Sequence, residues 1–211
     1  VLETGWEVFG RAGYTRRQLD GSATGVYIGL FNLEHASTAL AEVASIDTYT
    51  LTGTLHSAVA GRLSYWLGLT GPSVVVDTAC SSSLVALHLA CNALRRGECA
   101  MAVVGGASVL LSPAGYVLYS QTHGMSPSGR CRAFSGKADG MVRAEGCGAV
   151  LLKRLSLAQR DGDPILALIT GSAVNQDGRS NGFAAPSGAA QQAVSRRLWR
   201  RRSSNPAPST W

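Results

Sequence analysis

A strand, a turn, a helix and a second strand follow one another within residues 71–104, and this segment constrains the fold more than any other. The run Val74–Val76 predicts a short buried strand. Apolar residues at helical spacing predict a helix over Leu84–Arg96, which Gly97 is expected to end. A second valine-containing strand follows at Ala102–Val104. This order favours a parallel sheet covered by helices, and therefore an α/β fold.

The remaining apolar segments extend this alternation of helices and strands. Helices are expected at residues 1–9, 33–43, 57–67 and 156–160, and strands at 25–30, 149–152 and 165–174. Turn signals make the segment from Gly124 to Gly148 rich in loops, and a last helix is expected to begin at Gly188. The chain opens inside a helical pattern without an initiating methionine or an N-cap, so we expect it to be a piece of a longer protein.

The formal charge of +6 suggests an anionic partner such as nucleic acid, but the charge is unevenly distributed. Five of the 19 basic residues lie in the last sixteen positions, where there is no acidic residue: Arg196, Arg197, Arg200, Arg201 and Arg202. Without them, residues 1–195 hold 14 basic and 13 acidic side chains. The body of the chain is almost neutral, and we expect no nucleic-acid partner for it.

The composition is that of a globular enzyme core. Hydrophobic residues make up 45% of the chain, which excludes disorder of the whole chain. Charged residues make up only 15%, against about 25% in typical soluble domains, so a large interface or a larger parent domain is expected. No apolar run reaches the roughly 18 residues of a membrane span, and no signal peptide opens the chain. We therefore expect a cytoplasmic protein without a membrane partner.

The five cysteines are odd in number and form no Cys-x-x-Cys pair, so they predict neither a disulfide framework nor a metal site. A reducing environment fits this pattern best. Four of them are expected to be packing residues: Cys91, Cys99, Cys131 and Cys147. The fifth lies at a chemically different place in the chain.

Cys80 lies between the predicted strand and the start of the predicted helix. The free N–H groups and partial positive charge of a helix start favour a thiolate and can hold a developing oxyanion. The neighbours Ala79 and Ser81 are small, so a long acyl chain can approach the sulfur, and the serines at 81–83 offer an N-cap. A small buried apolar residue is the alternative role for Cys80, and spacing alone leaves both roles open.

The stretch from Asp77 to His88, Asp-Thr-Ala-Cys-Ser-Ser-Ser-Leu-Val-Ala-Leu-His, resembles the active-site signature of β-ketoacyl synthases. The resemblance is to the ketosynthase domains of modular type I polyketide synthases in particular, and it covers residues 1–194. Further family-like motifs occur in order along the chain: Gly61-Arg62-Leu63-Ser64-Tyr65, Gly68-Leu69-Thr70-Gly71-Pro72-Ser73, Gly129-Arg130-Cys131-Arg132-Ala133-Phe134, Ala138-Asp139-Gly140, Glu145-Gly146-Cys147-Gly148 and Gly171-Ser172-Ala173-Val174-Asn175-Gln176-Asp177-Gly178.

The resemblance implies a thiolase-like fold with α-β-α-β-α layers, built from two similar halves and usually homodimeric. This chain would hold about the N-terminal half and part of the middle. Cys80 would accept an acyl group as a thioester, and the acyl-enzyme would condense with a malonyl-type extender on acyl carrier protein, with loss of CO₂. No metal or other cofactor is implied, because the phosphopantetheine arm belongs to the acyl carrier protein. By analogy, Phe31 and Asn32 would approach the acyl pocket beside Ala79 and Ser81.

Two histidine motifs that assist condensation in the family are missing from this sequence. The four histidines present lie elsewhere and are expected to be packed or surface residues: His35, His56, His88 and His123. Glu145 is likewise expected to be a structural loop carboxylate. The 211 residues alone are therefore expected not to complete the condensation. The alternatives are a non-catalytic fragment or interaction module, and nucleic-acid binding through the arginine-rich tail.

Residues 195–211 form an arginine-rich tail that does not resemble the family. The segment Leu198–Pro206 can be encoded by a GC-rich string that reads Leu-Ala-Glu-Ala-Glu-Leu-Glu-Pro in another frame. That reading is the helix expected before the first missing histidine motif. We interpret the tail as the product of a frameshift or sequencing slip, a hypothesis that the nucleotide sequence tests directly.

Overall fold

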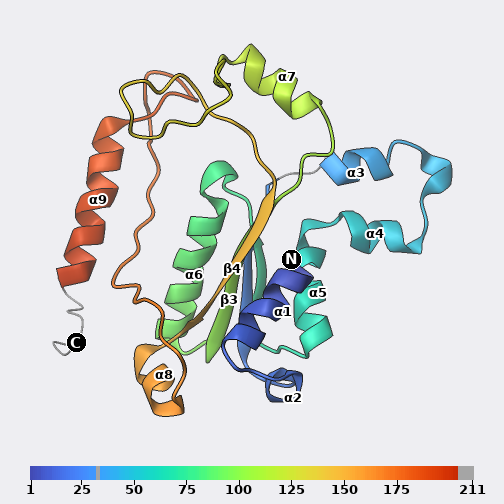
Figure 1. The fold of residues 1–211 in the computed structure, drawn as a ribbon, viewed down its shortest axis with the longest axis vertical. Coiled ribbons are helices and arrows are strands. Elements are labelled where there is room, and N and C mark those ends of the chain that lie inside the picture. The colour runs from blue at the N-terminus through green and yellow to red at the C-terminus, as the bar shows by residue number, and fades with distance from the viewer. Residues whose placement is uncertain (32–33, 204–211) are drawn as a thin grey trace.

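The computed structural model describes residues 1–31 and 34–203, and for 201–203 the backbone only (Figure 1). The helices are α1 (Leu2–Arg11), α2 (Arg16–Leu19), α3 (Glu34–Ala39), α4 (Thr48–Thr54), α5 (His56–Leu67), α6 (Ser82–Arg96), α7 (Ala114–Gln121), α8 (Leu155–Asp161) and α9 (Gly188–Ser203), with 3₁₀ turns at Val43–Ser45 and Ala79–Ser81. The strands are β1 (Thr24–Gly29), β2 (Ser73–Val76), β3 (Met101–Ser108) and β4 (Gly146–Lys153). No helix among the described residues combines the length and apolar character needed to cross a membrane.

The four strands form one sheet in the order β2-β1-β3-β4. Strand β1 pairs in parallel with β2 and with β3, which confirms the parallel sheet expected from the sequence. Strand β4 instead pairs antiparallel with β3, with Ser108 opposite Gly146. The reason is the path of the chain: α7 and the loop after it stay at the end of the sheet where β3 finishes, so β4 must run back (Figure 1).

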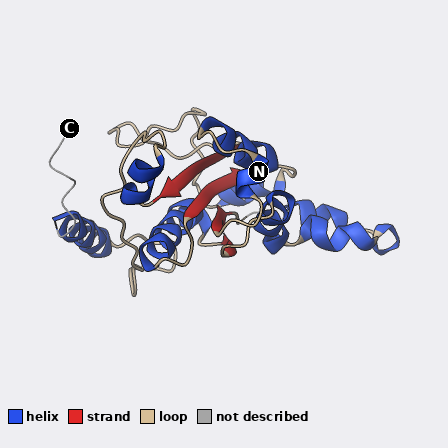
Figure 2. Cartoon of the chain, turned by 90° about the horizontal axis from the view of Figure 1, so that it is seen from below, coloured by secondary structure: helices blue, strands red, loops and turns tan. Residues whose placement is uncertain are grey.

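Helices cover both faces of the sheet, as the strand side chains require. In β1, Val26 and Ile28 pack on the side of α1 and α5, whereas Tyr27 packs on the side of α6. The side chains of β3 alternate in the same way: Val103 packs on the side of α1 and α5, and Val104 packs on the side of α6. Strands buried on both faces read as continuous apolar runs. The described residues thus form an α-β-α sandwich, and Figure 2 shows the red strands between the blue helices.

Helix α6 begins and ends close to its predicted bounds, but its N-terminus is built differently from the expectation. Gly97 ends it in the left-handed conformation, with φ 75°. Ser81 occupies the N-cap position without a capping hydrogen bond from its side chain. The 3₁₀ turn before the helix places Ser81 in a helical conformation, with φ −93° and ψ 0°, rather than the extended one in which a capping side chain reaches the next N–H groups.

The expected strand at 165–174 is wrong, because this segment has no regular secondary structure. Its side chains lie largely in solvent, and Leu166 is 98% exposed. A strand is stabilised by hydrogen bonds to a neighbouring strand, and none of the described strands pairs with this segment. The expected helix at 33–43 is also shorter, since α3 ends at Ala39.

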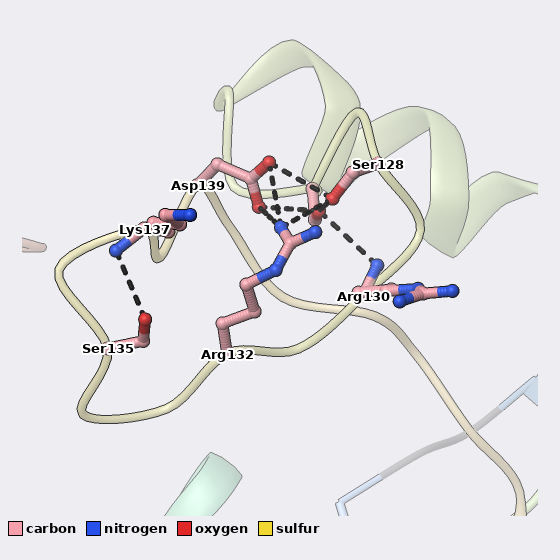
Figure 3. A network of polar contacts seen from close by, with 7 residues as sticks. Ser128, Arg130, Arg132, Ser135, Lys137 and Asp139 are labelled. Carbon is pink, nitrogen blue, oxygen red and sulfur yellow. Dashed lines mark hydrogen bonds and ion pairs between the residues drawn. The ribbon is translucent and has the colours of Figure 1, made fainter.

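The loop-rich segment between α7 and β4 is confirmed, and it is held together by a polar network around Asp139 (Figure 3). The carboxylate accepts hydrogen bonds from the hydroxyls of Ser126 at 2.7 Å and Ser128 at 3.1 Å. Arg132 forms an ion pair with the same carboxylate at 3.4 Å. The hydrogen bond from Ser126, followed by that from Ser128 and the charge of Arg132, lowers the pKa of Asp139, because each of these contacts favours the ionised carboxylate.

Candidate active site

Cys80 lies in the 3₁₀ turn between the end of β2 and the start of α6, with its side chain exposed. It lines a cleft of about 510 Å³. Other lining residues come from three chain segments: Gly29–Phe31 at the end of β1, Gly106–Ser108 at the end of β3, and Ala144–Gly146 at the start of β4. In open α/β sheets, ligands bind at the carboxyl ends of the parallel strands, and the cleft is at this edge.

Two glycines bring the first turn of α6 against the sheet. A methyl group on Gly29 would lie 2.6 Å from the Cα of Ser83. A methyl group on Gly106 would lie 3.0 Å from the Cβ of Ser83. Any larger side chain at either strand end would push the helix start, and Cys80 with it, away from the cleft floor. The sequence interpretation missed these glycines, although each is the last or nearly the last residue of an apolar strand pattern, where a close backbone approach is a recognised role for glycine.

The residue before Cys80 has a strained backbone. Ala79 has φ 54°, the left-handed region that non-glycine residues rarely adopt. Its conformation is held from both sides: the Ala79 N–H donates to the Asp77 carboxylate at 3.0 Å, and the Ser82 hydroxyl donates to the Ala79 carbonyl at 2.6 Å. Strain of this kind costs roughly 1–3 kcal/mol and is concentrated at functional sites.

Only some of the residues expected to bind substrate line the cleft. Phe31 and Ala79 line the cleft with Cys80. The hydroxyl of Ser81 donates to the Thr78 carbonyl at 2.9 Å, and Ser81 is not among the described residues that line the cleft. Asn32 lies outside the described residues.

The expectation of a structural role for Glu145 agrees with its contact. Its carboxylate accepts a hydrogen bond from the Leu110 N–H at 2.7 Å, although the residue also lines the cleft. Of the four histidines, all of which belong to the described part of the chain, none lines the cleft. His88 is half-buried on α6, with its Nδ1 2.8 Å from the hydroxyl of Ser172. It therefore ties the Cys80 helix to the irregular segment after β4.

The other cysteines divide into two groups. Cys91 and Cys99 are buried, as expected of packing residues, and burial raises the pKa of both thiols. Cys131 and Cys147 are exposed, so the expectation that they pack in the interior is wrong. Cys131 lies in the loop after α7, and Cys147 lies in the exposed first part of β4. Within the described ranges, no group of three or more potential metal ligands occurs.

Residues 1–158 match the family model of the β-ketoacyl synthase N-terminal domain. The chain belongs to the β-ketoacyl synthase family. Among its relatives, it is 53% identical over 196 residues to polyketide synthase GfsA of Streptomyces halstedii. It is 54% identical over 196 residues to a phenolphthiocerol/phthiocerol polyketide synthase of Mycobacterium tuberculosis. Each alignment covers 93% of this chain, but only 3% and 10% of those long proteins.

Solved ketosynthase structures share the fold of this chain. The ketosynthase from module 6 of the Bacillus subtilis bacillaene synthase superimposes with a TM-score of 0.86 at 40% identity. The oxazolomycin ketosynthase domain from Streptomyces albus superimposes with a TM-score of 0.87 at 39% identity. Both alignments cover 96% of this chain and about a third of the solved chain, 34% and 35%. The chain is thus part of a ketosynthase domain with a thiolase-like fold, to which it contributes one helix-covered sheet.

Proposed function

We propose that this part of the ketosynthase domain carries the acyl-accepting nucleophile, Cys80. The observation that carries the proposal is the position of this thiol: it is exposed, it follows the strained residue Ala79, and it faces a cleft at the carboxyl edge of the sheet. Cys91 and Cys99 are buried, and the exposed Cys131 and Cys147 are not among the described residues that line the cleft. The Cys80 thiol is therefore accessible to a substrate, its backbone is held in place, and an acyl chain bound to it can lie against the residues that line the cleft.

The proposed reaction begins with acyl transfer from a thioester of phosphopantetheine. The Cys80 sulfur, as a thiolate, attacks the carbonyl carbon, and the positive end of the α6 dipole stabilises the oxyanion that develops. The new bond joins the acyl carbon to the Cys80 sulfur. The bond to the phosphopantetheine sulfur breaks, and that sulfur leaves as a thiolate that takes up a proton. Gly29 and Gly106 keep the helix start close to the cleft during this step.

The second proposed step is the condensation. A malonyl-type extender loses CO₂, the resulting carbanion attacks the acyl carbon, and the Cys80 thiolate leaves. We infer that this step uses groups outside residues 1–211, because no histidine of the described chain lines the cleft. The proposed partners are acyl carrier protein, which brings both thioesters, and a second copy of the complete domain. Metal ions and redox cofactors have no part in this chemistry.

Acylation of the full 211-residue chain tests the proposal. The chain is incubated with hexanoyl N-acetylcysteamine thioester, and the modified cysteine is located by mass spectrometry of peptides. We expect hexanoylation at Cys80, loss of that modification in Cys80→Ala, and no change in Cys131→Ala, which removes an exposed thiol outside the cleft. A cooperatively folded chain that acquires no acyl group at Cys80 would instead favour the non-catalytic interaction module.

A further inference from the structure

Besides Cys80 and the start of α6, three chain segments line the cleft, and each leads within a few residues of the sequence to one charged cluster. The segment after β1 ends in Phe31 and continues to Glu34. The end of β3, at Ser108, continues to the loop 109–113. The segment before β4 contains Arg143 and Glu145. The sheet pairs the strand ends with one another, and contacts inside this cluster connect the segments that continue beyond those ends.

Glu34 is the centre of the cluster. One carboxylate oxygen accepts hydrogen bonds from the N–H groups of Leu111 at 2.6 Å and Ser112 at 2.9 Å. The other oxygen lies 3.3 Å from the Nη2 of Arg143. The Glu34 and Arg143 side chains are only 15% and 9% exposed, so solvent screens this ion pair weakly. One carboxylate thus joins the β1 segment to the β3 loop and to the β4 segment.

Glu145 adds a second carboxylate on the same loop. It accepts from the Leu110 N–H at 2.7 Å, so three consecutive N–H groups, 110 to 112, donate to two carboxylates. Hydrogen bonds to ionised acceptors are roughly twice as strong as neutral ones. The loop between β3 and α7 is held on both sides, although it has no regular secondary structure of its own.

Arg143 is fixed by aromatic rings as well as by Glu34. Its guanidinium lies 5.2 Å from the ring centre of Tyr116 and 5.6 Å from that of Tyr119, both on α7. Its Nη1 is buried and has no hydrogen-bond partner within the described part of the chain. A methyl group on Gly115 would collide with this guanidinium. The Arg143 guanidinium is therefore confined by its neighbours, and loss of the Glu34 charge would leave it buried without this counter-ion.

We propose that Glu34, with Arg143 and Glu145, is a positioning residue that sets the shape of the acyl cleft and thereby its selectivity for acyl chain length. This inference rests on the proposed function. A two-carbon acyl group on Cys80 ends near the sulfur, whereas a long chain must lie along the walls that the cluster holds. Loosening the cluster therefore slows transfer of long acyl chains and leaves short ones almost unaffected, because only the long chain depends on those walls for its orientation.

The test compares Glu34→Gln and Glu145→Gln with Glu42→Gln, which removes an exposed carboxylate from the same connection between β1 and α4. In Glu34→Gln, the amide oxygen can replace only one of the two carboxylate oxygens. If it accepts from the Leu111 and Ser112 N–H groups, the amide N–H₂ faces the Arg143 guanidinium, and both of these groups are donors. Rate constants for acetyl and octanoyl transfer to Cys80 from N-acetylcysteamine thioesters are measured by intact mass. We expect octanoyl transfer to fall by about tenfold or more in Glu34→Gln, acetyl transfer to change less than about twofold, and Glu42→Gln to match the unaltered chain.

An unchanged ratio of octanoyl to acetyl rates in the Glu34 and Glu145 variants would overturn the inference. If Glu34→Gln does not fold cooperatively, Glu145→Gln decides the question, because Glu145 is exposed and the substitution removes the charge that strengthens its hydrogen bond from the Leu110 N–H. If the unaltered chain accepts neither acyl group, the proposed function fails by itself. The shape of the cleft is then measured by alkylation of Cys80 with iodoacetamide and N-octyl iodoacetamide, for which the same loss of long-chain selectivity is expected.

Discussion

The last residue of β1, Gly29, lies directly against Ser83 in the first turn of α6, so that a methyl group at Gly29 would be 2.6 Å from the Ser83 Cα. This approach joins the end of a central strand to the helix that begins beside Cys80. It leaves no space for a side chain, and the neighbouring atoms belong to the backbone, which yields less easily than a side chain. The position of Cys80 therefore depends on the absence of a side chain at one strand end.

Replacement of this glycine tests that dependence. We expect Gly29→Ala to lower the free energy of unfolding by about 1–3 kcal/mol, because overpacking forces the helix start to move. The rate of Cys80 alkylation by iodoacetamide should change with it. Gly61→Ala is the matched control, since Gly61 lies within α5 with no atom near its added methyl group, and it should raise stability by about 0.5–1 kcal/mol. Equal stability of Gly29→Ala and the unaltered chain in urea denaturation would contradict the close approach.

The strain at Ala79 predicts an unusual response to glycine. Ala79→Gly should keep or increase the free energy of unfolding, within about 1 kcal/mol, because glycine adopts a positive φ without a steric cost. Ala58→Gly, in the helix α5, should instead lower it by about 1 kcal/mol. Thermal denaturation of both variants measures the difference. Destabilisation of equal size in the two variants would show that Ala79 carries no strain.

The contact between His88 and Ser172 predicts energetic coupling between α6 and the irregular segment after β4. With the Asn92 amide donating to Nε2 at 3.0 Å, Nδ1 carries the ring hydrogen and donates to Ser172. A double-mutant cycle of His88→Ala and Ser172→Ala should give a coupling free energy of about 0.5–1.5 kcal/mol in urea denaturation. His35→Ala, which removes an exposed histidine, should change stability by less than about 0.5 kcal/mol. Strict additivity would disprove the tether.

The ion pairs after β4 predict a loss of stability in acid. The hydrogen bond from Arg160, followed by that from Lys153, lowers the pKa of Asp161 to about 2. Because an unfolded aspartate has a pKa of about 3.9, the stabilisation is complete above about pH 4 and is lost as the pH falls through about 2. In Lys153→Met, the free energy of unfolding should therefore decline less steeply between pH 4 and pH 2. Urea denaturation at four pH values measures how steeply the free energy of unfolding depends on pH. The control variant Lys137→Met removes an exposed lysine and should show the same pH dependence as the unaltered chain.

Elements with a strong local pattern could be predicted from the sequence. The strand at Val74–Val76 and the helix ending at Gly97 occur where the apolar spacing and the glycine place them, although Val74 is exposed and only Val76 of this strand is buried. The strand expected at 165–174 has an equally apolar pattern but does not form, because pairing depends on a neighbour that its own residues do not encode. Exposure of Cys131 and Cys147 was missed for the same reason, since burial depends on which element covers a position.

The sequence by itself determined the family and the place of Cys80 between a strand and a helix, because these follow from motifs and spacings within a few residues. Only the tertiary structure decided that Glu34 reaches Arg143 and the loop at Leu111, residues 109 and 77 positions away. It also decided that β4 runs antiparallel and that Ala79 takes a left-handed conformation. Contacts between distant residues depend on the path of the whole chain, and the cleft beside Cys80 is lined by residues from four distant chain segments.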